Sequence, residues 1–280
     1  MLLSGNVAVS VLEGSLVVTG DHAGNSIIVD QVGLGSQQFR ITSGASATTI
    51  NGGAGPLVFS GVTKDVRFKM GGNDTVVLSA VKLPHNLLLR DATGTGTLAI
   101  NSSTVAGKLK VATKQEQLHF SASLSTVSRD VTITNKHGGG TLQFNTTSVG
   151  GRLRIREGKD NSTDGITLAG VHVSGKTRIH TGAGGDSVTV LDSSVFDGKF
   201  RLRTGLGSDI AALLSSTFNR SLAVLMGRGM DTTNVGIGGA ITAKKDAVFG
   251  GGSGTDTINI LTNGNTFAHG KDTDGYETVT

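Results

Sequence analysis

Residues 198–209 read Gly-Lys-Phe-Arg-Leu-Arg-Thr-Gly-Leu-Gly-Ser-Asp, and residues 175–186 read Gly-Lys-Thr-Arg-Ile-His-Thr-Gly-Ala-Gly-Gly-Asp. Both stretches begin with Gly-Lys, continue as an alternating strand-like run and end in a glycine-rich turn that closes with Asp. A unit that recurs at a fixed period of roughly 20–50 residues is typical of a solenoid, in which each unit buries its apolar side only against its neighbours. This repeat decides the fold class.

The unit can be followed along nearly the whole chain by the apolar pair that precedes each turn. Subtracting positions gives steps of 21–27 residues between pairs, most often 22. The pairs are Leu16/Val18, Phe39/Ile41, Val66/Phe68, Leu87/Leu89, Leu109/Val111, Val131/Ile133, Leu153/Ile155, Thr177/Ile179, Phe200/Leu202, Leu222/Val224 and Ala247/Phe249. A mostly polar residue lies between the members of each pair, and this alternation is typical of a short strand with one buried face.

A second apolar pair follows each turn, and a third, weaker apolar position separates the two, as Val188/Val190 and Phe196 illustrate. Three short strands in about 22 residues predict an all-β fold, a parallel β-helix of about 11 coils. The usual crossover chirality favours a right-handed helix. We expect one β-helix domain over residues 1–267, a C-terminal tail over 268–280, and a looped-out insertion at Ser43–Gly55.

Composition agrees with this fold. The 280 residues include 43 Gly and only 2 Pro, with no Cys or Trp. Glycine suits corners with positive φ, and the lack of Cys excludes a disulfide framework. No apolar run approaches the roughly 18 residues of a membrane span. Residues 1–4 lack the basic and apolar segments of a signal peptide.

The repeat at 198–209, together with Met-Gly-Gly-Asn-Asp-Thr-Val-Val-Leu at 70–78, resembles a family of tandem-repeat proteins. These are the long secreted proteins of planctomycetes and some other environmental bacteria, built from units of the form V-x-G-x-L-x-I-x-T-G-x-G-x-D-x-V-x-L. The resemblance extends from about Gly14 to Ile260. It implies an extracellular or cell-surface parallel β-helix without an assigned activity. The turn Asp is absent at Gly96, Glu116 and Gly140.

The turn Asp of the repeat raises the question of calcium, because Gly-x-Gly-x-Asp also occurs in calcium-binding β-rolls. In those rolls the motif recurs every nine residues, whereas here it occurs once per coil. The calcium candidates are Asp74, Asp186, Asp209, Asp231 and Asp256. We favour a structural interpretation, in which each Asp accepts a backbone N–H and closes its own turn, and we expect no obligatory cofactor.

A basic ladder is the second candidate site. The outward positions of the first strand carry Arg152, Arg154, Arg156, Lys176, Arg178, Lys199, Arg201 and Arg203. Stacked coils place like charges about 4.8 Å apart, which is unfavourable unless something offsets it. The favoured offset is a set of interleaved counter-charges from Asp160, Asp164, Asp186 and Asp209. The alternative is a polyanion such as an acidic polysaccharide, lipopolysaccharide or nucleic acid, with nucleic acid disfavoured because aromatic stacking residues are missing.

Catalysis has little support, so we expect that the protein is not an enzyme. The coils are nearly uniform, and the seven histidines, His22, His85, His119, His137, His172, His180 and His269, show no metal-ligand spacing. The pair Asp192/Asp197 is the only acid–base candidate. An ice-binding face is also disfavoured, since the outward positions of the second strand are mixed.

The sequence therefore favours a structural extracellular solenoid. Neither end shows a capping element, so we expect head-to-tail self-association into a fibre or a bacterial surface layer. The first alternative is an adhesin or polyanion- and glycan-binding module that uses the basic ladder, with an acidic polysaccharide as partner. A polysaccharide-active enzyme ranks third.

Overall fold

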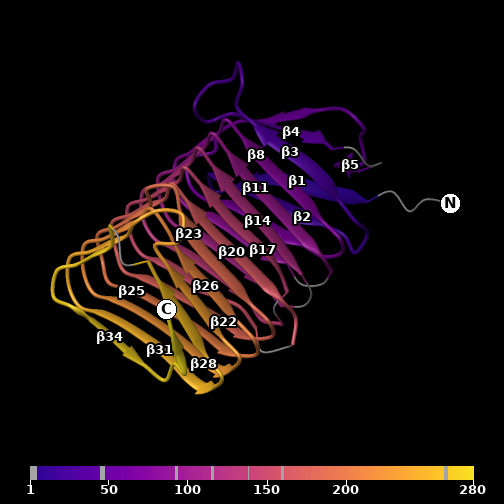
Figure 1. Cartoon of the computed structure of the whole chain (residues 1–280). Coiled ribbons are helices and arrows are strands. Elements are labelled where there is room, and N and C mark those ends of the chain that lie inside the picture. The colour runs from indigo at the N-terminus through magenta and orange to yellow at the C-terminus, as the bar shows by residue number, and fades with distance from the viewer. Residues whose placement is uncertain are drawn as a thin grey trace.

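A computed structural model of the chain describes residues 5–44, 48–91, 94–114, 117–137, 139–158, 161–261 and 264–280. The fold is all-β. Its coils stack along one axis, from the indigo N-terminal strands to the yellow C-terminal strands in Figure 1. Within the described residues three sheets, here called A, B and C, run along this axis.

Sheets A and B each have 13 described strands, and sheet C has nine. Sheet A contains β1 (Asn6–Leu12), β2 (Ser15–Gly20), β5 (Thr49–Ile50), β7 (Val66–Met70), β10 (Leu87–Asp91), β13 (Leu109–Thr113), β16 (Val131–Asn135), β19 (Leu153–Arg156), β22 (Thr177–Ala183), β25 (Phe200–Leu206), β28 (Leu222–Gly229), β31 (Ala247–Gly254) and β34 (Lys271–Asp274). Sheet B contains β3 (Ser26–Asp30), β4 (Phe39–Ser43), β6 (Leu57–Phe59), β8 (Thr75–Ser79), β11 (Gly96–Asn101), β14 (Leu118–Ser123), β17 (Gly140–Asn145), β20 (Asp164–Ala169), β23 (Ser187–Leu191), β26 (Ile210–Leu213), β29 (Thr232–Val235), β32 (Thr257–Ile260) and β35 (Thr278–Val279). Sheet C contains β9 (Lys82–Leu83), β12 (Thr104–Val105), β15 (Thr126–Val127), β18 (Ser148–Val149), β21 (His172–Val173), β24 (Val195–Phe196), β27 (Thr217–Phe218), β30 (Thr242–Ala243) and β33 (Thr266–Phe267).

The regular part is a parallel β-solenoid with one strand from each sheet in every coil. Each strand pairs in parallel with its equivalent one coil later, for example Phe200 with Leu222 and Leu202 with Val224. The apolar members of the alternating pairs face inward, and Phe200 and Leu202 are 1% and 0% exposed. Neighbouring coils also stack aromatic rings, with Phe196 and Phe218 centroids 5.3 Å apart. The predicted fold class and in–out alternation are confirmed.

Glycine is required where the coils approach each other at the corner between sheets A and B. Gly205 has φ of +131°, and a Cβ on it would lie 1.9 Å from the carbonyl oxygen of Gly182 in the preceding coil. A side chain would therefore be strained and would also collide with backbone. This close contact explains why glycine follows Thr in the repeat unit.

The solenoid has about nine turns rather than 11, because the first two apolar pairs are not successive coils. Leu16 pairs directly with Val66, so β2 stacks on β7. The pair Phe39/Ile41 lies in β4, which is antiparallel to β3. The alternation of apolar and polar residues shows which side of a strand is buried but not the direction in which the strand runs. The antiparallel strand β4 therefore has the same sequence pattern as a strand of a parallel coil.

The N-terminal end is covered, contrary to the expectation that neither end carries a cap. β1 runs antiparallel to β2, and β4 runs antiparallel to both β3 and β6. The predicted insertion at Ser43–Gly55 contributes β5, which pairs with β1, while residues 45–47 lie outside the described part. Short outermost strands and antiparallel pairs replace the open coil edge that would template another layer.

The segment 268–280, expected to be a tail, contributes β34 and β35 to the ends of sheets A and B. Tyr276 packs partly buried against the core, and its hydroxyl lies 2.8 Å from Thr233 Oγ1. The last coil thus continues the winding of the solenoid.

Candidate functional site

Three adjacent strands of sheet A bring the predicted basic ladder together. Arg154, Arg178 and Arg201 occupy one column across β19, β22 and β25. A second column holds Arg156, His180 and Arg203 on the same strands. Arg152, Lys176 and Lys199 stand immediately before these strands and form a third.

All eight predicted cations are exposed, and all of them except Lys199 border two adjoining grooves. The larger groove has a volume of about 350 Å³ and is lined by Arg154, Ile155, Arg156, Arg178, Ile179, His180, Arg201 and Arg203. The second, of about 290 Å³, is lined by Asp130, Thr132, Arg152, Leu153, Arg154, Lys176 and Arg178. We call this surface of β19, β22 and β25 the basic face.

The cations of the basic face have almost no acidic partners. Within the described residues, only Arg152 reaches a carboxylate, with its Nη2 3.6 Å from Asp130 Oδ2. The other seven form no ion pair with any described residue. Like charges on strands about 4.8 Å apart repel by about 1 kcal/mol per pair even at the dielectric constant of water.

The predicted interleaving of counter-charges is therefore wrong for three of its four residues. Asp164, Asp186 and Asp209 are 3%, 1% and 1% exposed and belong to the solenoid interior. The fourth, Asp160, lies outside the described residues. These aspartates lie at the start of strands of sheet B, at positions that face the interior. The corner between sheets A and B therefore turns them away from the outer surface of sheet A.

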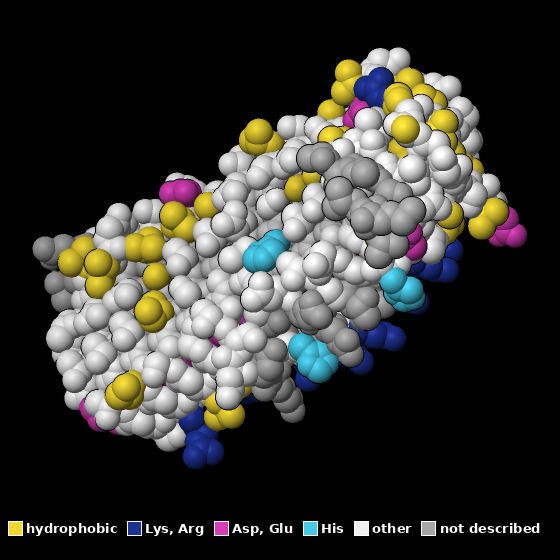
Figure 2. Space-filling model, turned by 90° about the vertical axis from the view of Figure 1, so that its right-hand side faces the viewer, with side chains coloured by type: hydrophobic (Ala, Val, Ile, Leu, Met, Phe, Trp, Pro, Cys, Tyr) yellow, Lys and Arg dark blue, Asp and Glu magenta, His cyan; other side chains and the backbone are white. Residues whose placement is uncertain are grey.

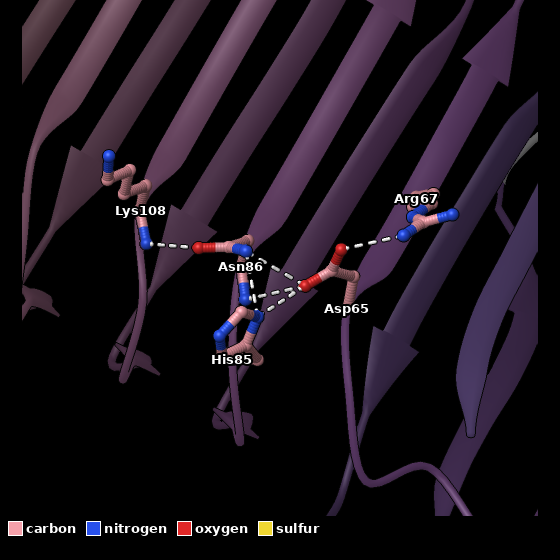
Figure 3. Close-up of polar contacts among 5 residues, drawn as sticks. All are labelled: Asp65, Arg67, His85, Asn86 and Lys108. Carbon is pink, nitrogen blue, oxygen red and sulfur yellow. Dashed lines mark hydrogen bonds and ion pairs between the residues drawn. The ribbon is translucent and has the colours of Figure 1, made fainter. Parts of the chain in front are cut away.

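In the N-terminal coils of sheet A, by contrast, basic side chains are paired with a carboxylate (Figure 3). Asp65 accepts hydrogen bonds from Arg67 Nη2 at 2.9 Å and from Asn86 Nδ2 at 2.9 Å, and lies 2.6 Å from His85 Nδ1. Burial disfavours the ionised form of Asp65, but the bonds from His85, Arg67 and Asn86 outweigh it and lower its pKa to about 2. A carboxylate is thus built into the first coil of this face.

Asp130 repeats this arrangement three coils further along. Its Oδ1 accepts the Arg152 backbone N–H at 2.9 Å, and its Oδ2 lies 3.8 Å from Lys108 Nζ. The backbone bond from Arg152 is the main cause that lowers the pKa of Asp130, and the charges of Arg152 and Lys108 add to it. Beyond Asp130 no described carboxylate stands on the basic face.

The distribution of charge over the whole rod is uneven. In Figure 2 most of the Lys and Arg side chains in view lie along one edge, and the rest of that face is largely uncharged. The chain has 25 Lys and Arg against 21 Asp and Glu. Because several of the acids are buried, the surface is more basic than the formal net charge of +4 suggests.

The calcium candidates form a second feature, which we call the aspartate column. Asp186, Asp209, Asp231 and Asp256 occupy one register position at the start of sheet B, each 0–1% exposed. Asp164 belongs to the same column, at the position that pairs with Gly140. It was missed because Asn161-Ser162-Thr163 replaces the glycine turn, although its distance of 22 residues from Asp186 signals the repeat.

Hydrogen bonds in this column join one coil to the next rather than closing a turn. Oδ1 of Asp209 accepts the Asp186 backbone N–H at 2.8 Å, and Oδ1 of Asp231 accepts that of Asp209 at 2.8 Å. Oδ1 of Asp256 accepts that of Asp231 at 2.9 Å. The prediction that these Asp residues accept backbone N–H groups is confirmed. In this column, however, each N–H belongs to the preceding coil and not to the turn of the Asp itself.

In the coils nearer the N-terminus, other residues occupy the same register position. Asp74 stands alone there and accepts the Asn25 backbone N–H at 2.8 Å. Gly96, Leu118 and Gly140 fill the intervening coils, and the predicted gap at Glu116 lies outside the described residues. The column proper therefore comprises Asp164, Asp186, Asp209, Asp231 and Asp256.

Burial changes the acidity of this column. It is the main cause that raises the pKa of Asp231 to about 6, and the neighbouring carboxyls of Asp209 and Asp256 add to it, against the bond from the Asp209 N–H. Burial also raises the pKa of Asp209, against bonds from the Asp186 N–H and the Thr204 side chain. Burial raises the pKa of Asp74 as well.

The described residues contain no group of three or more His, Cys, Asp and Glu side chains arranged to hold a metal ion. Four of the five calcium candidates, all except Asp74, come together in one column, but each coil contributes one carboxylate. The expectation of no obligatory cofactor thus stays a prediction, with calcium as its alternative, and chelation can test it.

The remaining sequence candidates are dispersed. Asp197 pairs with His172, its Oδ2 2.7 Å from Nε2, and accepts Asn219 Nδ2 at 2.6 Å. Asp192 is exposed in a turn with φ of +55° and is no partner in these contacts. His119 lies outward on β14, 2.9 Å from Thr141 Oγ1.

Comparisons of the chain with known protein families, curated proteins and solved structures found no match. The resemblance to the planctomycete repeat proteins accordingly stays a prediction. In the described part of the chain there is no helix of the length and apolarity that crossing a membrane requires.

Proposed function

We propose that this protein is a structural β-solenoid whose basic face binds a linear polyanion, with an acidic polysaccharide as the expected ligand class. The extracellular or cell-surface location expected from the repeat is part of this proposal. So is a binding role without catalysis. The observation that carries it is the stack of cations on β19, β22 and β25, for which the described residues supply no acidic partner.

The geometry of the columns supports a polymer rather than a small anion. The cations repeat along the solenoid axis with the strand spacing of about 4.8 Å, so negative groups on an extended chain can meet them successively. Guanidinium groups suit this purpose because each can donate two parallel hydrogen bonds to one carboxylate or sulfate. The exposed grooves leave the donors accessible.

The unpaired charge also supports the proposal energetically. Repulsion among Arg154, Arg178 and Arg201 is relieved when a polyanion replaces the diffuse counter-ions around them. Nucleic acid fits less well, because the groove-lining residues include no Phe, Tyr or Trp on which bases could stack.

Head-to-tail fibre growth is the less favoured candidate. It needs two complementary open ends, and antiparallel pairs of β1, β4 and β6 occupy the N-terminal end.

The test compares retention of variants on immobilised polygalacturonate as the salt concentration rises. The wild type should bind at low salt and elute as the charges are screened. The variant Arg154→Ala/Arg178→Ala/Arg201→Ala removes the central column and should elute at much lower salt.

A matched control removes three exposed cations on or beside sheet C, as Lys82→Ala/Arg220→Ala/Lys244→Ala. Both triple variants lose the same net charge, so only the position of the loss differs. Equal elution of the two variants would show that retention follows net charge and would refute a specific basic face.

A further inference from the structure

The aspartate column contains three successive carboxyls, Asp209, Asp231 and Asp256, at 1%, 1% and 0% exposure. They stand on equivalent positions of neighbouring coils, so the strand spacing of about 4.8 Å separates each from the next. Charges at this separation in a dry interior interact strongly, because the protein screens them much less than water does.

Each carboxyl uses only part of its hydrogen-bonding capacity. Oδ1 of Asp231 and of Asp256 accepts one backbone N–H from the preceding coil. Oδ2 of both residues is buried and has no hydrogen-bond partner in the described structure. A buried ionised carboxylate with an unsatisfied oxygen is disfavoured relative to the neutral acid.

Among the described residues, the groups that face Asp231 supply no positive charge to offset its ionisation. Asp209 and Asp256 flank it, and from the last coil come Tyr276, whose pKa burial raises to about 12, and Glu277, whose Oε2 accepts the Asp256 N–H. Arg228, the nearest cation in sequence, is exposed and forms no ion pair with a described acid.

We propose that the buried carboxyl of Asp231, with those of Asp209 and Asp256 on either side, is a proton-binding site inside the solenoid, which makes the C-terminal coils less stable as the pH rises from about 4 towards neutral. The site is separate from the basic face and does not depend on the proposed function. Its ligand is the proton, taken up by a carboxylate as a neutral acid forms.

The sign follows from comparing the folded and unfolded states. An unfolded Asp releases its proton near pH 3.9, whereas folded Asp231, with a pKa of about 6, retains it longer. Between these values the folded state binds more protons than the unfolded state, so stability falls as the pH rises through this window. Below it both states are protonated, and above it both are ionised.

The experiment measures urea unfolding of the wild type and of Asp231→Asn from pH 4 to pH 8. Asn keeps an oxygen for the Asp209 N–H and imitates the neutral acid. The variant should match the wild type near pH 4, lose less stability as the pH rises, and exceed the wild type at pH 8. Asp130→Asn, an outer carboxyl whose pKa is lowered, should leave the shape of the wild-type curve unchanged over this window.

A second measurement follows protonation directly rather than through unfolding. With the Asp carboxyl carbons labelled with ¹³C, NMR should show a signal that titrates near pH 6 and is absent from Asp231→Asn. Parallel curves for wild type and variant, or aspartates that are all ionised at pH 5, would overturn the proposal.

Calcium provides the competing outcome. If calcium stabilises the wild type at pH 8 and chelator reverses this, while Asp231→Asn responds to neither, the column holds a cation rather than protons. That result would also overturn the proposal. It would leave the polygalacturonate test of the basic face unaffected, since that test reads a different surface.

Discussion

The outer surface of sheet A has two regions that differ at one position of the repeat, the residue immediately before the strand. In the N-terminal region this position holds Asp65, Asn86 and Asp130, with Lys108 between the last two. In the basic face it holds Arg152, Lys176 and Lys199. The position that supplies a carboxylate in one region therefore supplies a further cation in the other.

The outward strand positions strengthen the same difference. In the N-terminal region a neutral residue interrupts each outward column of cations: Leu88 lies between Arg67 and Lys110, and Ala112 follows Lys69 and Arg90. In the basic face they form continuous columns across three strands. A uniform backbone thus carries a partly neutralised surface in one region and a continuously charged one in the other.

The largest expected effect tests whether the two regions share the same interior. Leu109 and Leu202 are inward residues of sheet A, one in each region, 1% and 0% exposed. Replacing either with Ala should cost about 2–5 kcal/mol of unfolding free energy through lost burial and a cavity. Arg201→Ala, on the outside of the same strand, should cost less than about 1 kcal/mol. Chemical denaturation of the three variants measures these values, and equal losses at Leu202 and Arg201 would contradict the register of β25.

The second prediction converts the basic face into a copy of the neutralised region. Lys176→Asp/Lys199→Asp places carboxylates before β22 and β25, where Asp65 and Asp130 stand in the earlier coils. We expect the affinity for polygalacturonate to fall by roughly 10- to 1,000-fold, since each Lys→Asp change removes two units of positive charge from the basic face.

The matched control for this variant is Lys82→Asp/Lys244→Asp on the sheet C side. Each Lys→Asp change removes two units of charge, so both double variants reduce the formal net charge from +4 to zero. Titration calorimetry or column retention should separate them clearly. A control that weakens binding as much as the test variant would mean that position does not matter.

Sequence reasoning predicted most of the regular solenoid, because apolar alternation and a constant period report directly on buried faces. Phe200 and Leu202 point inward, and Arg154, Arg178 and Arg201 share a column, as the period requires. The N-terminal cap was not predictable in this way. The alternation of Phe39-Arg40-Ile41 is the same in an antiparallel strand as in a parallel coil.

The candidate site was predicted only in part. The cations could be aligned from their spacing, but whether an Asp after a glycine turn points out or in depends on the path of the corner. Asp164, Asp186 and Asp209 therefore looked like counter-charges and are in fact buried. The resulting lack of neutralisation, which carries the proposed function, becomes visible only in three dimensions.

The smallest expected effect concerns the carboxylate that distinguishes the N-terminal region. Asp65 is 8% exposed, and its pKa of about 2 lies below that of an unfolded Asp. The folded state therefore favours the ionised form, and this stabilisation is present above about pH 4 and is lost as the pH falls towards 2. Asp65→Asn should destabilise the protein at pH 7 by roughly 1–2 kcal/mol, allowing for partial solvent screening, and by much less near pH 2.

Asp246→Asn is the comparison, because Asp246 holds the equivalent position before β31 with a side chain 76% exposed. Its replacement should change stability by less than about 0.5 kcal/mol at either pH. Urea unfolding at pH 7 and pH 2.5 distinguishes the two variants. If Asp65→Asn is as harmless as Asp246→Asn at pH 7, the bonds from Arg67, His85 and Asn86 do not stabilise the first coil. The contrast between the two regions would then be one of surface charge alone.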